Sequence, residues 1–219
     1  MNPQEMNNLF SSALHSAERG DFESAEKKYE QCLRVAQHAA PPLAQSDLAK
    51  FVRSTAINLA QVLNKLEKFP EALAQIDLAT LNSPTPTGWA IALAAKGEAL
   101  CRLGRIKDGT QAFAEAVRAQ PVIGSLNSAD SMTRMKSTHF LEEAQRLIDH
   151  VLNSYGDQIS PSLRAEAYTI NGKIAVRRRD LSLAYQWFSR ARREVPGYAD
   201  AELQMQLLRT SFDGDKRRQ

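Results

Sequence analysis

Cysteine is scarce in this chain, aromatic residues make up only 7%, and long apolar runs are missing. Two cysteines are too few for a disulfide framework or for a cysteine-rich zinc site. No apolar stretch approaches the roughly 18 residues of a membrane-spanning helix, and the opening MNPQEMNNLF has neither the basic nor the apolar region of a signal peptide. We therefore expect a soluble, cytoplasmic protein that makes no contact with a membrane.

Catalytic motifs are missing as well. The sequence has no GxxxxGKS/T loop, no GxGxxG and no GxSxG, and none of its four histidines belongs to an HExxH pattern. Cys32 falls on an apolar stripe, where a thiol acts as a small hydrophobe, and Cys101 has no histidine placed to activate it. We expect no enzymatic activity, no metal ion and no cofactor.

Amphipathic helices are what the sequence does contain. Hydrophobic residues make up 43% of the 219 residues, which excludes a chain disordered throughout. Apolar residues recur at spacings of three and four, as after Gly20, where they are Phe22, Ala25, Tyr29, Cys32, Leu33 and Ala36. Glycine and proline fall between the periodic segments, so the pattern predicts an all-α protein made of short helices joined in pairs.

The helix pairs share an order of small, apolar and turn residues. The third and last pairs show it best, with Gly97, Leu100, Gly104, Ile106, Phe113, Ala116 and Pro121, and with Tyr168, Gly172, Ala175, Leu181, Ala184, Phe188, Ala191 and Pro196. This order resembles the tetratricopeptide repeat (TPR) family, although Gly109 stands where the family prefers alanine. The resemblance implies a right-handed α-solenoid of about five helical hairpins with a C-terminal capping helix.

The repeats predict a single domain over residues 1–212. Its hairpins are expected near 6–39, 42–85, 86–122, 125–158 and 161–197, with the cap over 198–212 and a basic disordered tail over 213–219. The hairpin over 125–158 is the most degenerate, because Met132 and Met135 replace the usual glycine and aromatic residue.

In TPR proteins the first helices of successive hairpins line a concave groove that holds a peptide or helix of a partner protein. The resemblance implies that this groove contains Phe10, Leu14, Ile57, Asn58, Gln61, Asn64, Lys65, Ile91, Glu98, Arg102, Lys173 and Arg177. It implies a non-catalytic adaptor, scaffold or chaperone-like protein. Of the positions with which some TPR domains bind C-terminal carboxylates, only Asn58 matches, so we do not expect a carboxylate clamp. The alternative is that the amides merely solvate an exposed helix face.

The basic residues are concentrated in one segment. Residues 164–193 carry eight lysines and arginines against Glu166 and Asp180, although the whole chain has a net charge of only +3. The candidate basic surface comprises Arg178, Arg179, Arg190, Arg192 and Arg193. Such a surface would suit nucleic acid or an acidic partner, but charged helix faces are more often simply solvated. Homo-oligomerisation is also left open by the sequence.

Overall fold

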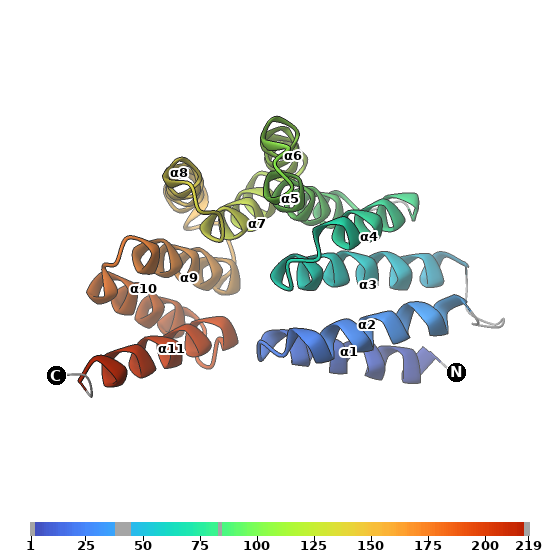
Figure 1. The fold of residues 1–219 in the computed structure, drawn as a ribbon, viewed down its shortest axis with the longest axis horizontal. Helices are drawn as coiled ribbons and strands as arrows, with labels where there is room; N and C mark the ends of the chain where they lie inside the picture. Colours follow the sequence, from blue (N-terminus) through green and yellow to red (C-terminus); the bar gives the residue numbers. More distant parts are fainter. Residues whose placement is uncertain (1–2, 38–44, 83–84, 217–219) are drawn as a thin grey trace. The chain divides into compact units, whose positions relative to one another are not determined.

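The structure is a computed structural model that describes residues 3–37, 45–82 and 85–216. Across these residues it contains helices and turns and no strand, which confirms the predicted all-α class. The helices are α1 (Pro3–Glu18), α2 (Phe22–Gln37), α3 (Gln45–Lys65), α4 (Phe69–Leu81), α5 (Pro86–Arg102), α6 (Ile106–Ala119), α7 (Pro121–Thr133), α8 (Thr138–Tyr155), α9 (Pro161–Arg177), α10 (Leu181–Glu194) and α11 (Ala199–Lys216) (Figure 1).

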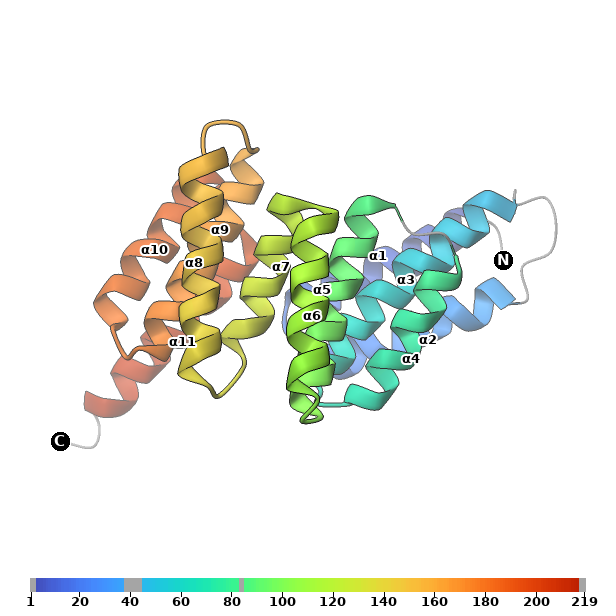
Figure 2. The same ribbon diagram turned by 90° about the horizontal axis from the view of Figure 1, so that it is seen from above.

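The helices are grouped in two compact units, residues 1–128 and residues 129–219, which we call the N-terminal and C-terminal units. In the N-terminal unit α3 packs against α2 on one side and α4 on the other (Figure 1). In the C-terminal unit α9 packs against α8 and α10 (Figure 2). Within hairpins, α1 packs against α2, α3 against α4, α5 against α6 and α9 against α10, which confirms a fold of helical hairpins. The hairpin over 125–158, the handedness of the stack and the single domain over 1–212 stay predictions.

Four hairpins have the same turn. At each turn the second residue after the first helix has a positive φ: Gly20 (79°), Glu67 (60°), Gly104 (83°) and Arg179 (63°). The next residue's amide reaches back to a carbonyl of the first helix, as from Lys68 to Leu63 (2.9 Å) and from Asp180 to Ala175 (2.9 Å). This closing bond is typical of a left-handed helix C-terminus. The four turns therefore repeat in backbone geometry, although only two of them have glycine at the positive φ.

Small residues allow the two helices of a hairpin to approach closely. A Cβ atom at Gly97 would lie 2.7 Å from the Phe113 ring, and Gly172 faces Phe188 in the same way. Both pairs are sixteen residues apart, as are the buried pairs Ala13 with Tyr29 and Ala60 with Ile76. Ala72, Ala116 and Ala184 are fully buried. The recurring small and large residues therefore form the interior of each hairpin, as the repeat pattern predicts.

The ends of two helices differ from the predicted boundaries. Helix α7 begins at Pro121, before the expected start at 125, because proline suits the first turn of a helix. Helix α11 begins one residue after the predicted cap and continues to Lys216, so residues 213–216 are helical rather than part of a tail. Residues 217–219 lie outside the described residues. Met205 and Leu208 of α11 are buried against Phe188, as expected of a capping helix.

Candidate peptide-binding surface

The first helices of the N-terminal unit form one layer. Helix α3 contacts both α1 and α5, while α2, α4 and α6 are the second helices of the three hairpins. Positions on α1, α3 and α5 can therefore contribute to a continuous surface. We use the name α3 strip for Leu14, Asn58, Gln61, Asn64 and Ile91, which come from these three helices.

Most of the apolar residues predicted to line the groove pack in the hydrophobic core instead. Ile57 is 6% exposed and belongs to the core of the N-terminal unit, which corrects its assignment to the groove. The centre of the Phe10 ring lies 5.7 Å from the centre of the Tyr29 ring and 6.0 Å from that of Phe51, so Phe10 mainly fills the space between helices. Leu14, by contrast, is 38% exposed and is available to a partner.

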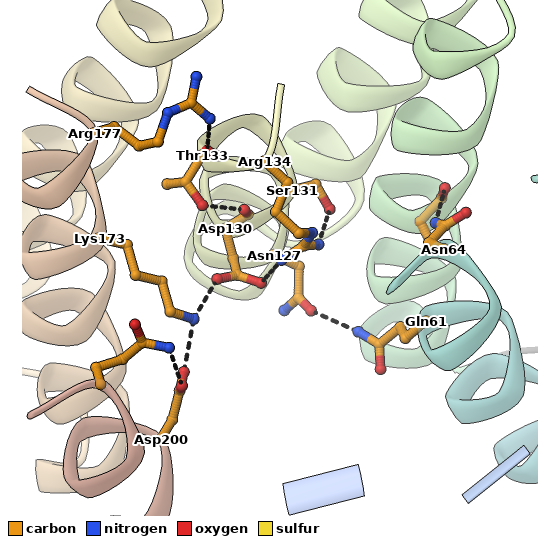
Figure 3. A network of polar contacts seen from close by, with 12 residues as sticks. Gln61, Asn64, Asn127, Asp130, Ser131, Thr133, Arg134, Lys173, Arg177 and Asp200 are labelled. Atoms are coloured by element: carbon orange, nitrogen blue, oxygen red, sulfur yellow. Dashed lines mark hydrogen bonds and ion pairs between the residues drawn. The ribbon is translucent and has the colours of Figure 1, made fainter. Parts of the chain in front are cut away.

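Internal hydrogen bonds fix the amides of α3. Asn58 Nδ2 donates to the Ser54 carbonyl (2.8 Å), and the buried Asn64 donates through Nδ2 to the Ala95 carbonyl of α5 (2.8 Å). Gln61 Nε2 donates to Asn127 Oδ1 of α7 (3.2 Å) (Figure 3). The three side chains were predicted to stand on one exposed face. The structure holds them in place, with Asn58 and Gln61 half-buried. Asn64 is only 4% exposed, which corrects the prediction that it stands on an exposed face.

The charged residues predicted for the same surface interact within the N-terminal unit. Lys65 Nζ lies 4.8 Å from the centre of the Phe22 ring, and the Arg102 guanidinium lies 5.0 Å from the centre of the Phe69 ring. Arg102 also forms an ion pair with Glu67. Glu98 is only 2% exposed, so it belongs to the interior rather than to an open groove.

Lys173 and Arg177 belong to a polar network of the C-terminal unit. Lys173 Nζ lies 2.7 Å from Asp130 Oδ1 of α7 and 2.7 Å from Asp200 Oδ2 of α11 (Figure 3). Arg177 donates to the carbonyls of Thr133 (2.5 Å) and Met135 (2.7 Å). Both cations therefore join α9 to its neighbours, and the chain itself occupies these predicted groove positions.

The ion pairs determine the protonation of this network. Burial lowers the pKa of Lys173, but the carboxylates of Asp130 and Asp200 more than offset that effect, so its pKa lies above the usual range. Glu166 on the same helix has its pKa raised to about 7, because it is buried and because Asp130 and Asp200 are negative. Lys173 partly opposes that rise. Burial also raises the pKa of Tyr198, with Glu166 adding to the effect.

Glu166 gives the C-terminal unit a pH-dependent stability. Its pKa is about 7 when folded and 4.5 ordinarily, so the folded state holds a proton that the unfolded state releases between these values. The contribution of Glu166 to stability therefore rises as the pH falls from 8 to 5. We expect Glu166→Gln to raise the free energy of unfolding at pH 8 by up to about 2 kcal/mol and to change little at pH 5.

Urea denaturation of the two proteins across this pH range measures the difference directly. The control is Glu142→Gln, because Glu142 is exposed on α8. A constant offset between Glu166→Gln and the parent protein at every pH would show that Glu166 does not titrate in this range.

Acids outside the basic segment interact with several of its cations. Besides Asp130 and Asp200, Glu202 pairs with Arg192 Nε at 2.6 Å. The remaining contacts are made by Arg164 with Glu194 (2.9 Å), by Arg178 with Gln145 (3.3 Å), and by Arg190 with the Trp187 ring (4.7 Å). Arg179 and Arg193 are exposed. Arg192 is exposed as well, although its charge is paired with Glu202, so the basic surface stays a prediction.

The thiols lie in positions that disfavour nucleophilic chemistry. Both cysteines are free and buried. Burial raises the pKa of Cys32 to about 11, and burial together with the Glu98 charge raises that of Cys101 to about 11, so both are protonated at neutral pH. Among the described residues no three histidine, cysteine or acidic side chains gather where they could hold a metal ion. None of the helices in this described part of the chain is both long and apolar enough to span a bilayer.

The roles of Asn127, Asp130 and Asp200 were not predicted from the sequence. Each contacts a residue far away in the chain: Asn127 is 66 residues from Gln61, while Asp130 and Asp200 are 43 and 27 residues from Lys173. Only one feature of the sequence could have indicated these contacts: the three residues belong to helices that follow α3 or α9 in the series of hairpins.

The chain is similar to proteins of known structure. No protein-family model and no curated protein matches the chain. A TPR repeats protein from Bacteroides fragilis NCTC 9343 is 15% identical, with 96% of this chain and 99% of that chain covered and a TM-score of 0.38. A tetratricopeptide repeat protein from Parabacteroides merdae ATCC 43184 is 15% identical, with 94% and 99% covered and a TM-score of 0.35. The repeated hairpin turns and the glycine–phenylalanine packing described above make this chain TPR-like in its own right.

Proposed function

We propose that this chain is a non-catalytic protein-interaction module, an adaptor or scaffold, that binds a peptide or helical segment of a partner protein on the α3 strip. The observation that carries the proposal is the set of amides on α3, held by internal hydrogen bonds. Side chains that are already ordered lose little conformational entropy when a partner binds. Exposed Leu14 on the neighbouring helix α1 supplies an apolar anchor.

The proposal extends to the cellular location of the module and to the class of its partner. We infer a cytoplasmic location, in keeping with two cysteines that are both free. A chaperone-like role would use the same surface. The basic surface is less suited to binding nucleic acid, because its Arg192 is paired with Glu202 of α11.

A matched pair of leucines tests the location of the surface. Leu14 on α1 and Leu183 on α10 are both 38% exposed, so replacement by arginine perturbs them to a similar degree. The full chain is applied to an array of random dodecapeptides, and fluorescence anisotropy gives the affinities of the peptides that bind. We expect Leu14→Arg to weaken binding at least about tenfold, through loss of an apolar contact and introduction of an unpaired charge. Leu183→Arg should leave the affinity unchanged.

The outcomes are distinguishable. Equal affinities for Leu14→Arg and the parent protein would place binding away from the α3 strip. An array without any bound peptide would refute the peptide-binding function itself. Thermal denaturation of both variants establishes that each is folded.

A further inference from the structure

One face of α10 carries polar and basic side chains and no acid. The helix packs against α9 and α11 (Figure 1) and buries an alanine-rich side between them. On the opposite side, four exposed residues follow one another at spacings of three and four, so they share one helix face. We use the name α10 stripe for these residues, Ser182, Gln186, Arg190 and Arg193.

The two arginines of the stripe have no ion pair within the described residues. The acids beside them bind other cations: Glu194 pairs with Arg164 at 2.9 Å, and Glu202 pairs with Arg192 at 2.6 Å. The stripe arginines are three residues apart, so their Cβ atoms lie about 5–6 Å from each other and their like charges repel. The folded chain therefore leaves a local positive charge that an anionic partner would neutralise.

The guanidinium group of Arg190 is held in place by stacking. Its central carbon lies 4.7 Å from the centre of the Trp187 ring, and Trp187 stacks in turn on Tyr168 of α9, with ring centres 5.7 Å apart. A guanidinium that lies over an aromatic ring keeps its five N–H donors in its own plane. Arg190 is thus ordered before a partner binds, which lowers the entropy cost of binding, and its in-plane donors remain available.

The surroundings of the stripe favour a carboxylate over a nucleic acid. The neighbouring Arg192 already bonds a carboxylate, that of Glu202, although both side chains are 43% exposed. Single strands of nucleic acid bind basic surfaces largely by stacking bases on free aromatic rings. Trp187 is engaged with Tyr168 and with an arginine, and the exposed Tyr185 lies outside the stripe.

We propose that the α10 stripe binds an acidic segment of a partner protein in which two carboxylates lie one helical turn apart. Acids three or four residues apart on a helix match the spacing of Arg190 and Arg193, and each guanidinium can bond both oxygens of one carboxylate. Ser182 and Gln186 add neutral donors on the same face. The stripe belongs to the C-terminal unit and the α3 strip to the N-terminal unit, so the inference goes beyond the α3 strip.

The experiment measures the affinity of the full chain for a defined acidic helix. The probe is a fluorescein-labelled, alanine-rich helical peptide with glutamates along one face, and the reference is the same peptide with glutamines. Fluorescence anisotropy at low ionic strength gives both affinities. We expect the glutamate peptide to bind at least about tenfold more tightly than the glutamine peptide. The double variant Arg190→Gln, Arg193→Gln should weaken it at least about fivefold.

A matched control removes the same charge elsewhere. Arg19 and Arg118 are exposed arginines of the N-terminal unit, so Arg19→Gln with Arg118→Gln changes the net charge equally and should leave the affinity unchanged. Gln186→Glu tests the stripe without removing a cation. Its carboxylate would lie one turn before Arg190 and compete for it, so binding should weaken at least about threefold. Thermal denaturation establishes that every variant is folded.

Four outcomes would overturn the proposal. The first is a parent chain that does not bind the glutamate peptide, and the second is an equal loss of affinity in the double variant and its matched control. The third is a single-stranded oligothymidylate that binds more tightly than the glutamate peptide and is lost in the double variant, which would assign the stripe to nucleic acid. The fourth is loss of the glutamate peptide in Leu14→Arg, which would place it on the α3 strip. An unchanged affinity in Leu14→Arg supports the α10 stripe whatever the α3 strip binds.

Discussion

Gly109→Ala should destabilise the N-terminal unit by about 1–3 kcal/mol, the usual cost of overpacking, although the same change inside most helices is stabilising. The reason is the close approach of α5 and α6. A Cβ atom at Gly109 would lie 2.7 Å from the Gly97 carbonyl oxygen and would also collide with Cys101 Sγ. The carbonyl belongs to a helix backbone and cannot move without shifting α5.

The two parts of this collision can be separated by a double-mutant cycle. Cys101→Ala removes the sulfur but leaves the Gly97 carbonyl in place, so it should restore part of the lost stability in the Gly109→Ala background. Thr110→Ala, at an exposed neighbouring position of α6, serves as the control for helix propensity. Chemical denaturation of the four proteins gives the coupling free energy. A Gly109→Ala variant that melts at a higher temperature than the parent would show that the helices are not in close contact here.

Gly109 shows what the repeat pattern predicts and what it does not predict. At Gly109 the TPR pattern calls for alanine, and from sequence alone the glycine looks like a departure. The structure shows that Gly97 and Gly109 face each other, so a Cβ atom at either position would crowd the carbonyl oxygen of the other, at 3.0 Å and 2.7 Å. Apolar periodicity predicts which helix face is buried, but the distance between two helices depends on pairs of residues that periodicity does not identify.

The turns show a similar division between what sequence does and does not reveal. Gly20 and Gly104 mark two of the four equivalent turns, because glycine adopts positive φ without strain. Glu67 and Arg179 adopt the same conformation without that signal. Helix pairs before and after them were nevertheless predictable, because amphipathic segments on both sides require the chain to reverse.

The candidate site was the least predictable part. The positions of Asn58, Gln61 and Asn64 on one helix follow from their spacing of three. The direction of each amide depends on Ser54, Ala95 and Asn127, and two of these lie on other helices. Sequence could therefore suggest which residues lie on this helix face, whereas the orientation of each amide required the contacts of α3 with α5 and with Asn127.

Lys173 also depends on partners far away in the chain, and we expect its replacement to destabilise the C-terminal unit strongly. Its side chain is only 18% exposed and bonds both Asp130 and Asp200. Removing the cation leaves Asp200 without this partner and Asp130 with Arg134 alone, and the two carboxylates then repel each other beside half-buried Glu166. Loss of one partner from a fully buried ion pair costs about 3–5 kcal/mol, and the 41% exposure of Asp200 reduces that figure. We expect Lys173→Met to lower the free energy of unfolding by about 2–3 kcal/mol.

The matched control is Lys50→Met. Lys50 pairs with Asp47 at 3.3 Å on the surface of α3, with side chains 65% and 58% exposed, so its removal should cost less than about 1 kcal/mol. A second comparison adds Asp130→Asn and Asp200→Asn to Lys173→Met. If the loss arises from uncompensated charge, these changes should recover a large part of it, because neutral amides no longer repel each other. Urea denaturation measures every variant at pH 7.5. Equal destabilisation by Lys173→Met and Lys50→Met would show that solvent screens the Lys173 network as fully as a surface pair.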